Sequence, residues 1–298
     1  MSNLPFRSYV SISRSRIAAN FREVLGAVGP GVTVCGVVKA DAYGHGALEV
    51  SRILEQEGVG WLAVSSVEEG VALRRAGRSS RILVMAGFLR HEREALLAYN
   101  LTPAAHSLED IGELEQFAAA NGKQIPYHLK IDSGMSRLGT RACVDQIVSA
   151  IQASGNARCE GLMTHFASAS DYGSLQTDHQ AAAFREMRDK LGQAGIAPLY
   201  FHTSSTNAIA YGRRDAWHNM VRAGHAIYGY VSPARGDAPP RILHVKPALE
   251  WKAKILLVKD VPEGALVGYG GAFRAPRPMR IGVLAVGYAD GLPHRLSN

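Results

Sequence analysis

Lys39 is the residue whose position most favours chemistry. It ends an apolar run, following Val37 and Val38, and AlaAspAlaTyrGlyHisGly comes directly after it. A lysine amine that leaves water at the end of a buried strand loses its proton more readily and becomes the nucleophile that a Schiff base requires. A lysine whose stem packs while its ammonium group reaches solvent is the structural alternative. Position alone leaves both interpretations open.

Two later segments could bind a phosphate group. ThrSerSerThrAsn at 203–207 offers hydroxyl groups and the start of a short helix, and Gly224 and His225 offer backbone N–H groups. In barrel proteins, the loops after the last two strands frequently bind phosphate through such groups. A simple helix N-cap is the alternative for the hydroxyl cluster. A phosphate site that faces a strand-end lysine is what pyridoxal 5′-phosphate (PLP) needs.

Arg222 falls inside an apolar strand-like run, and an arginine buried there must be paired. One role for it is to contact the pyridine nitrogen of PLP.

His128, His165 and His202 fall near strand ends and could suggest a metal, but no dense set of acidic residues accompanies them. We therefore predict no metal site. The glycine-rich nucleotide motifs, HExxH and GxSxG are absent.

The elements that must position these residues alternate between strand-like and helical patterns. The predicted strands are Thr33–Lys39, Gly60–Ser65, Arg81–Ala86, Thr102–His106, Tyr127–Asp132, Cys159–His165, Leu199–Thr203 and Met220–Tyr228. Helical spacing of apolar residues marks His45–Glu57, Val67–Gly77, Leu108–Asn121, Val144–Ser154 and Gln176–Ala194. Eight strands separated by helices predict an α/β fold of the (β/α)₈ type over residues 1–235. An open doubly wound sheet would give the same local pattern, but the count of eight favours the barrel.

The pattern changes after Ser232. A turn-rich link leads to segments 245–260, 265–268 and 280–288, which alternate as strands with Gly/Pro turns. We therefore expect a β-rich second domain over residues 240–298. It is small for a closed β-domain, so we expect it to be incomplete.

Composition excludes several classes of protein. Among 298 residues, 47% are hydrophobic and 20% charged, which is typical of a globular chain and not of a disordered one. The net charge is +7, but the basic residues are scattered, so no nucleic-acid partner is expected. No apolar stretch is long enough to span a bilayer, and the first 20 residues show no secretory pattern. The three cysteines form no CxxC pair, which indicates reduced thiols and a cytoplasmic location.

The motifs together resemble those of alanine racemases. ValValLysAlaAspAlaTyrGlyHisGly at 37–46 is similar to the cofactor-lysine signature of that family. Further similar motifs are HisLeuLysIleAspSerGlyMetSerArgLeuGly at 128–139, MetThrHisPhe at 163–166, ValArgAlaGlyHisAlaIleTyrGly at 221–229, GlyTyrGly at 268–270 and GlyTyrAlaAspGly at 287–291. The resemblance covers essentially the whole chain. It implies PLP, a barrel with a β-rich second domain, alanine as substrate, and a head-to-tail homodimer with shared active sites.

The resemblance also implies roles for individual residues. Lys39 would be the Schiff-base lysine and one of two bases, and Tyr269 of a second copy would be the other. The remaining implied residues are the phosphate ligands Tyr43, Ser205, Thr206, Gly224 and His225, and the pyridine partner Arg222 with His202 beside the cofactor. Arg137 would lie near the phenolic oxygen of the cofactor and contact the substrate, and His165 would lie next to the tyrosine base. Lys130 would be a lysine that can carry a carbamate, and Tyr288 would lie at the substrate entrance. The implied reaction interconverts L- and D-alanine and supplies D-alanine for peptidoglycan.

Some features depart from the family pattern. Ser205 and Thr206 stand where the family usually has Asn then Ser, and His225 replaces a typical aliphatic residue. Family members continue well past GlyTyrAlaAspGly, so the resemblance implies a C-terminally truncated second domain. Two alternatives stay open: a non-catalytic or weakly active PLP-binding barrel, and a related barrel-type amino-acid decarboxylase. A decarboxylase would need a carboxylate where Arg222 stands.

Overall fold

The computed structural model describes residues 6–296, so the extreme ends of the two predicted domains, 1–5 and 297–298, lie outside the described residues. The chain divides into two compact units. One is Arg14–Ala248, and the other combines the N-terminal segment with the chain from Leu249 onward. The division differs from the expected one at the N-terminus, because β1 (Ser8–Ile12) pairs with β10 (Leu249–Ala253). No helix among residues 6–296 is long and apolar enough to cross a bilayer.

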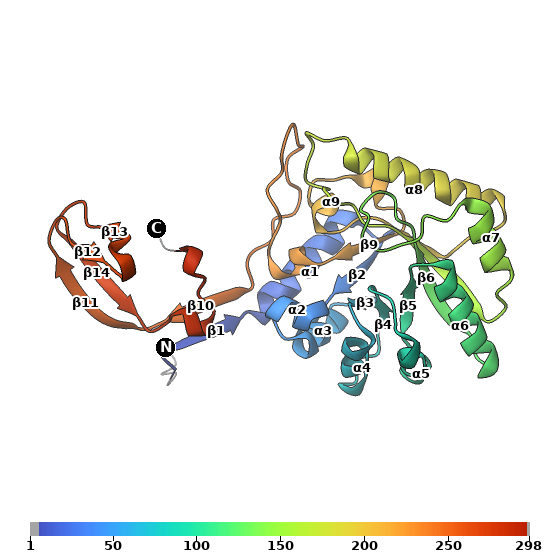
Figure 1. Ribbon diagram of the computed structural model, residues 1–298, viewed down its shortest axis with the longest axis horizontal. Coiled ribbons are helices and arrows are strands. Elements are labelled where there is room, and N and C mark those ends of the chain that lie inside the picture. The colour runs from blue at the N-terminus through green and yellow to red at the C-terminus, as the bar shows by residue number, and fades with distance from the viewer. Residues whose placement is uncertain (1–5, 297–298) are drawn as a thin grey trace. The chain divides into compact units, whose positions relative to one another are not determined.

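The larger unit is a barrel-like sheet of eight parallel strands surrounded by helices, as expected (Figure 1). The strands lie in the order β8-β7-β6-β5-β4-β3-β2-β9. Their bounds are β2 Thr33–Val37, β3 Trp61–Val64, β4 Arg81–Val84, β5 Thr102–Ala105, β6 Ile125–Lys130, β7 Ala157–Met163, β8 Tyr200–His202 and β9 Met220–Ala223. Each of the eight lies within or overlaps a predicted strand.

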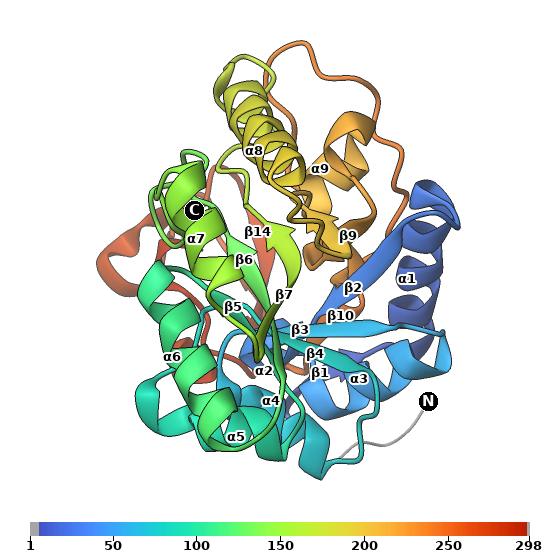
Figure 2. The ribbon, with the colours of Figure 1, turned by 90° about the vertical axis from the view of Figure 1, so that its right-hand side faces the viewer.

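The helices pack outside the sheet (Figure 2). They are α1 Arg14–Val28, α3 Ala47–Gln56, α4 Val67–Arg75, α5 Arg93–Ala98, α6 Leu108–Ala120, α7 Val144–Gln152, α8 Gln176–Gln193 and α9 Thr206–Ala210. Five of these correspond to predicted helices. The helix expected from His45 begins two residues later, because Gly46 has φ +86° and lies outside the helical region.

Strand alternation separates two apolar layers. Cys35 and Val37 face the barrel interior with Trp61 and Leu83, whereas Val34 packs outward in the layer under the helices. The outer layer is much larger than the inner one. The barrel interior therefore has room for polar groups, and several of them belong to the site described below.

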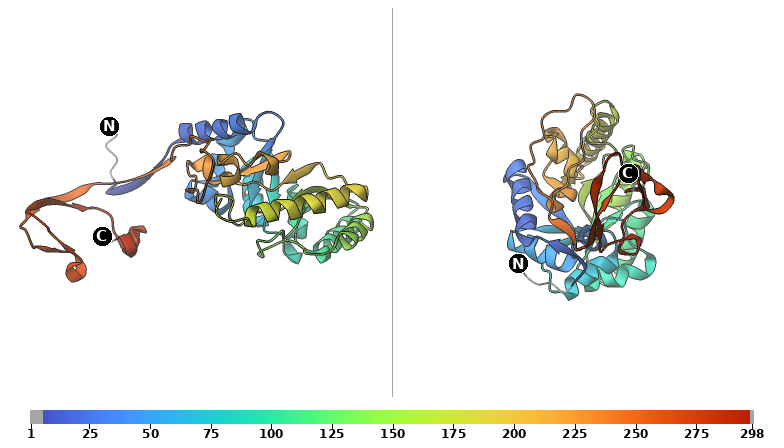
Figure 3. Two further views of the ribbon diagram at one scale, coloured as in Figure 1. Left: turned by 90° about the horizontal axis from the view of Figure 1, so that it is seen from above. Right: turned by 90° about the vertical axis from the view of Figure 1, so that its left-hand side faces the viewer.

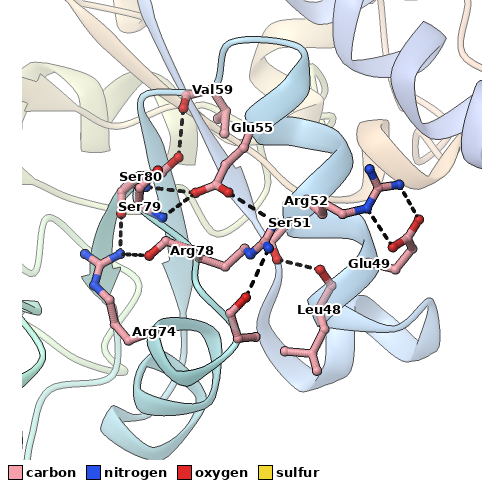
Figure 4. A network of polar contacts seen from close by, with 11 residues as sticks. Leu48, Glu49, Ser51, Arg52, Glu55, Val59, Arg74, Arg78, Ser79 and Ser80 are labelled. Atoms are coloured by element: carbon pink, nitrogen blue, oxygen red, sulfur yellow. Dashed lines mark hydrogen bonds and ion pairs between the residues drawn. The ribbon is translucent and has the colours of Figure 1, made fainter.

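Polar contacts fix the loops at the end of the barrel where the strands begin (Figure 4). Glu55 of α3 accepts the backbone N–H groups of Ser79 and Ser80, both at 2.8 Å, and pairs with Arg78 at 3.2 Å. Arg74 of α4 donates to the carbonyl oxygens of Arg78 and Ser80. These contacts hold α3 and α4 to the segment that enters β4.

β8 and β9 are the two end strands of this order, and an isolated bridge, not a ladder, connects the β9 strand to the residues after β8. The backbone N–H of Arg222 donates to Ser204 O at 3.0 Å, and Ser205 and Arg222 form an isolated parallel bridge. The Asn219 side chain completes this contact by accepting from Phe201 N and donating to Leu199 O. The Asn219 side chain thus supplies hydrogen bonds between the β8 and β9 regions that the short backbone of β8 does not supply.

The smaller unit is β-rich, as expected. Its strands are β1, β10, β11 Ile255–Val261, β12 Leu266–Val267, β13 Phe273–Arg274 and β14 Met279–Leu284. They form three antiparallel pairs, β1–β10, β11–β14 and β12–β13; the first is visible in Figure 3. The segment expected as one strand over 245–260 is divided at Lys254 into β10 and β11. Ile255, Leu256 and Leu257 are each more than half exposed.

Gly161 of β7 leaves space for a buried ring. A Cβ at this position would lie 2.6 Å from the His128 ring, which is fully buried. We expect Gly161→Ala to destabilise the barrel by about 1–3 kcal/mol through overpacking. The check is the free energy of unfolding in urea. Gly192→Ala in α8 is the control, since nothing lies within 4 Å of its Cβ; an equal effect of both substitutions would contradict the steric argument.

Candidate active site

A cavity of about 600 Å³ lies at the end of the barrel where the strands terminate. Its walls bring together ten of the thirteen site residues expected from the sequence: Lys39, Tyr43, Lys130, Arg137, His165, Ser205, Thr206, Arg222, Gly224 and His225. The volume lies within the range of small-molecule sites. Segments that are far apart in the sequence thus converge on one space.

Lys39 enters the cavity from a strained turn. It begins α2 (Lys39–Gly44), in which the four residues 40–43 have φ between 51° and 54°, the left-handed region. That conformation costs about 1–2 kcal/mol for each non-glycine residue. Surrounding contacts must hold this segment, as is common where strain occurs at functional sites.

Tyr43 lies in the same turn and approaches Gly224 closely. A Cβ on Gly224 would lie 3.1 Å from the Tyr43 hydroxyl oxygen. The Tyr43 ring also contacts the rings of His225 and Tyr228, with centroids 4.9 and 5.2 Å away. Burial raises the pKa of the Tyr43 phenol, and Glu69 adds to the effect, so the hydroxyl stays protonated and can donate a hydrogen bond.

Thr206 organises the polar end of the cavity. Its hydroxyl oxygen accepts the N–H groups of Gly224 at 3.2 Å and Ala226 at 3.1 Å. Thr206 is the first residue of α9, and Ser205 precedes it as the N-cap. Backbone N–H groups and hydroxyls therefore gather where the sequence predicts phosphate binding.

Arg222 is 3% exposed and hydrogen-bonded through both terminal nitrogens. Nη1 donates to His202 Nδ1 at 2.6 Å and to His202 O at 2.9 Å. Nη2 donates to Thr164 O at 2.6 Å, with His165 Nδ1 and Thr203 O at 3.1 and 3.2 Å. Burial lowers the pKa of Arg222 to about 10, so the guanidinium group stays charged at neutral pH. Within residues 6–296, its Nε–H alone has no acceptor and is available to a bound group.

The contacts of Arg222 fix the protons on two buried histidines. Since Arg222 only donates, His202 accepts at Nδ1 and carries its proton on Nε2, which lies 2.8 Å from His128 Nδ1. His128 must then carry its proton on Nε2, 4.0 Å from a carboxylate oxygen of Glu160. Desolvation lowers the pKa of His128 to about 3 and that of His202 well below its usual value, so both rings are neutral. His202, expected among the cofactor ligands, instead lies behind Arg222 and outside the cavity wall.

His165 and Lys130 both lose charge through burial. Desolvation, reinforced by Arg222, lowers the pKa of His165 to about 3 and that of Lys130 to about 8. Neutral His165 accepts from Arg222 at Nδ1, which leaves its Nε2–H as a donor. Lys130 is therefore partly an uncharged amine near neutral pH.

The loop after β6 positions Arg137. It folds back on the strand through Asp132 N–H to Thr140 O at 3.0 Å and Thr140 N–H to Lys130 O at 2.9 Å. Gly139 has φ +113°, and a Cβ there would lie 2.8 Å from the Asp132 nitrogen. Only glycine fits where the loop folds back against β6, which explains the glycine that ends the motif at 128–139.

Tyr269 and Tyr288 belong to the smaller unit. They are 92% and 54% exposed. Tyr269 begins a short 3-10 turn with Gly270 and Gly271, and Tyr288 begins another. Their roles stay predictions.

The cavity also uses residues that the sequence analysis did not name. They are Val37, Ser65, Met85, Ala86, Leu138, Met163, the segment Phe166–Ser170, Asn207 and Ser232. Ser65, Met85 and Ala86 directly follow β3 or β4, and Phe166 comes three residues after β7, so positions near strand ends were a usable signal. Nothing in their residue types distinguishes them from ordinary loop residues.

The donor set fits PLP. Lys39 offers an amine, the Thr206 region offers N–H and hydroxyl groups, and Arg222 Nε–H offers a donor for a ring nitrogen. The lack of a Cβ on Gly224 leaves the backbone accessible beside the Tyr43 hydroxyl. Among residues 6–296, no three histidine, cysteine or acidic side chains gather as a metal site would require.

Comparisons with known proteins agree along the chain. Residues 12–233 match the family model "Alanine racemase, N-terminal domain" and residues 248–298 match "Alanine racemase, C-terminal domain". The alanine racemase of Synechocystis sp. is 36% identical over 296 residues, covering 98% of this chain and 78% of that protein. That of Halothermothrix orenii is 37% identical over 292 residues, covering 98% and 76%.

Solved structures are similar as well. Alanine racemase from Clostridium difficile 630 has a TM-score of 0.86 at 32% identity, covering 98% of this chain and 76% of that one. The Bartonella henselae alanine racemase, described with covalently bound pyridoxal phosphate, has a TM-score of 0.84 at 26% identity, covering 98% and 79%.

The neutral buried histidines make stability depend on pH. Because His128 has a folded-state pKa of about 3, below its unfolded value of about 6.5, the unfolded chain binds more protons between these values. This contribution is fully present above pH 6.5 and is lost as the pH falls towards 3. Between pH 7 and pH 5, His128 alone should cost about 2 kcal/mol.

His128→Asn tests this expectation, since the Asn amide oxygen can still accept from His202. Urea unfolding of the variant should show a shallower loss of stability between pH 7 and 5 than the parent protein. Exposed His91→Gln is the control and should keep the parent slope. Equal slopes in all three proteins would contradict the assignment of a neutral His128.

Proposed function

The chain belongs to the alanine racemase family, and from this premise we propose that it is a PLP-dependent isomerase that interconverts L-alanine and D-alanine. The observation that carries the proposal is the convergence of Lys39 and Arg222 on one cavity. An amine, a phosphate-type cradle and a buried guanidinium group are the three contacts that PLP needs. Lys39 begins α2 just after β2, Thr206 begins α9, and Arg222 lies on β9.

We propose that Lys39 carries the cofactor through its amine. Tyr43, Ser205, Thr206, Gly224 and His225 would hold the phosphate group. Arg222 would donate Nε–H to the pyridine nitrogen. Because a guanidinium group only donates, it keeps that nitrogen unprotonated, which disfavours return of a proton to the cofactor and hence transamination.

Racemisation requires a proton to leave one face of the substrate Cα and another to arrive on the opposite face. When bound, PLP makes this C–H acidic, since its ring accepts the electrons left behind. The Lys39 amine would remove or return the proton on one face. The Tyr269 phenol of a second copy would act on the other face.

Three further residues would support this exchange. Neutral His165, with Nδ1 occupied by Arg222, would donate its Nε2–H to the Tyr269 oxygen and stabilise the deprotonated phenol. Arg137 would contact the substrate side of the site. Lys130, with its pKa lowered to about 8, has the uncharged amine that carbamate formation by CO₂ requires. A carbamate would place a negative charge among the surrounding cations.

A homodimer with shared active sites is part of the proposal. Tyr269 is exposed in the smaller unit of its own chain, which fits a residue that completes the site of a second copy. Tyr288, also exposed, would lie at the substrate entrance formed in this way.

The two alternative functions, a non-catalytic PLP-binding barrel and an amino-acid decarboxylase, are not favoured. The curated relatives are named alanine racemases over nearly the whole chain, which does not favour a non-catalytic PLP-binding barrel. A guanidinium group, not a carboxylate, is available for the pyridine nitrogen, which opposes the decarboxylase. The proposed role is supply of D-alanine for peptidoglycan. The free Cys35, Cys143 and Cys159 fit a reducing, cytoplasmic compartment.

Lys39→Ala tests the proposed function. Purified protein supplied with PLP should show the visible absorption band of a lysine-bound cofactor and should racemise alanine, measured by circular dichroism or a D-alanine assay. The variant should lose the band, together with several orders of magnitude in rate, because it loses both attachment and one base. A band trapped by borohydride on another lysine of the variant would refute the assignment.

Subunit sharing has its own test. Inactive Lys39→Ala chains mixed with inactive Tyr269→Phe chains should recover up to about a quarter of the parent activity, since a mixed dimer contains one intact site and half of the dimers are mixed. Subunit exchange is verified by mass spectrometry of differently tagged chains. No recovery after verified exchange would contradict shared sites.

A further inference from the structure

Local backbone preference opposes the shape of the segment that carries Lys39 and Tyr43. Residues Ala40 to Tyr43 all have left-handed φ, and none of them is glycine. Asp41 supports the end of the segment by accepting Ala47 N–H at 2.7 Å. A second contact must hold its beginning, next to Lys39.

Glu69 of α4 provides that contact. One of its carboxylate oxygens accepts Ala40 N–H at 2.6 Å, and the other accepts Ser65 N–H at 2.7 Å. Ala40 directly follows Lys39, and Ser65 follows β3 on the cavity wall. A single carboxylate therefore joins the ends of two adjacent strands at the mouth of the barrel. Bonds from N–H groups to a charged carboxylate are stronger than neutral ones.

The local sequence would otherwise give Glu69 a different partner. Ser66 is the N-cap of α4 and accepts Glu69 N–H at 3.3 Å, so Ser66-x-x-Glu69 has the form of a capping box. In that motif the glutamate side chain bonds to the N-cap N–H. Here the carboxylate instead bonds to the preceding residue and to another strand. Its geometry serves the Lys39 turn in addition to its own helix.

We propose that Glu69 is a positioning residue that holds the strained Lys39–Gly44 turn in the conformation that presents Lys39 and Tyr43 to the cavity. The inference rests on the proposed function of these two residues as PLP contacts. Without Glu69 the turn relaxes towards ordinary backbone angles, and the amine and the phenol leave their positions. Small displacements of positioned groups cost large factors in rate.

Glu69→Gln is the first test, because the amide keeps the size of the side chain but turns one acceptor into a donor facing an N–H group. PLP affinity, measured by absorbance titration of the apo-protein, should fall at least about tenfold, with a similar fall in kcat. Glu68→Gln is the matched control: its side chain is exposed in the same helical turn. Parent-like PLP affinity in Glu69→Gln would overturn the proposal.

Ala40→Gly separates positioning from general stability. Glycine adopts left-handed φ without strain, so it should restore PLP affinity in the Glu69→Gln background by several-fold and change it little in the parent. A purely structural loss would not be rescued in this way. Ala119→Gly on α6, which is exposed and helical, should rescue neither protein.

The same pair of substitutions gives a readout without PLP. Ala40→Gly should raise the urea midpoint of the apo-protein more in the parent, where the turn is held strained, than in Glu69→Gln, where it has relaxed. Equal shifts in the two backgrounds would overturn the proposal, even if the parent bound no PLP. Should Glu69→Gln fail to fold, Glu69→Asp, whose shorter arm reaches only one of the two N–H groups, replaces it in the cycle.

Discussion

The structure of the barrel interior depends on the need to satisfy one buried guanidinium group. Arg222 can only donate, so every neighbour must present an acceptor. Two carbonyl oxygens from the loop after β7 and the end of β8, the Thr203 carbonyl and two imidazole nitrogens meet this requirement. The backbone of Arg222 also bonds to Ser204 where the sheet closes. The same residue therefore contributes to the contact between the two end strands of the sheet, fixes the proton positions on His202 and His128, and adds a positive charge to the cavity wall.

The residues around the cavity fall into two groups, one held by dense hydrogen bonds and one carried by a strained turn. Arg222, His202 and Thr206 are held by dense hydrogen bonds on strands and a helix start, whereas Lys39 and Tyr43 lie on a turn that local preference opposes. Contacts from α4 and from the start of α3 hold this turn. Such an arrangement orders the reactive groups before any ligand arrives, so that binding does not have to supply the ordering.

The sequence predicted the fold and most of the cavity wall for a simple reason. The strands are short apolar runs bounded by turns, and the polar residues at their ends must meet at one edge of a closed parallel sheet. What it could not show depends on distant packing. The N-terminal strand β1 pairs with β10, more than 200 residues away, and the residue types of Ser8–Ile12 do not indicate that partner. His202 sits at a strand end like His165, but only the three-dimensional arrangement places it behind Arg222. The left-handed turn was hidden because none of its residues is glycine. Glu69 had a local signal, its capping-box spacing, but that pattern points to a different role.

The imidazole chain behind Arg222 has a further consequence. From Arg222 through His202 to His128, each N–H group points away from the cavity, and the last of them, on His128 Nε2, has no hydrogen-bond partner among residues 6–296. Passing a proton along such a chain would require both rings to turn over. His128 packs against Trp61 and Tyr200 and is fully buried, which opposes such a turn. In this arrangement the chain does not carry protons away from the cavity. We therefore expect hydrogen exchange between bulk water and the reacting groups to occur at the cavity end of the barrel and not along this chain.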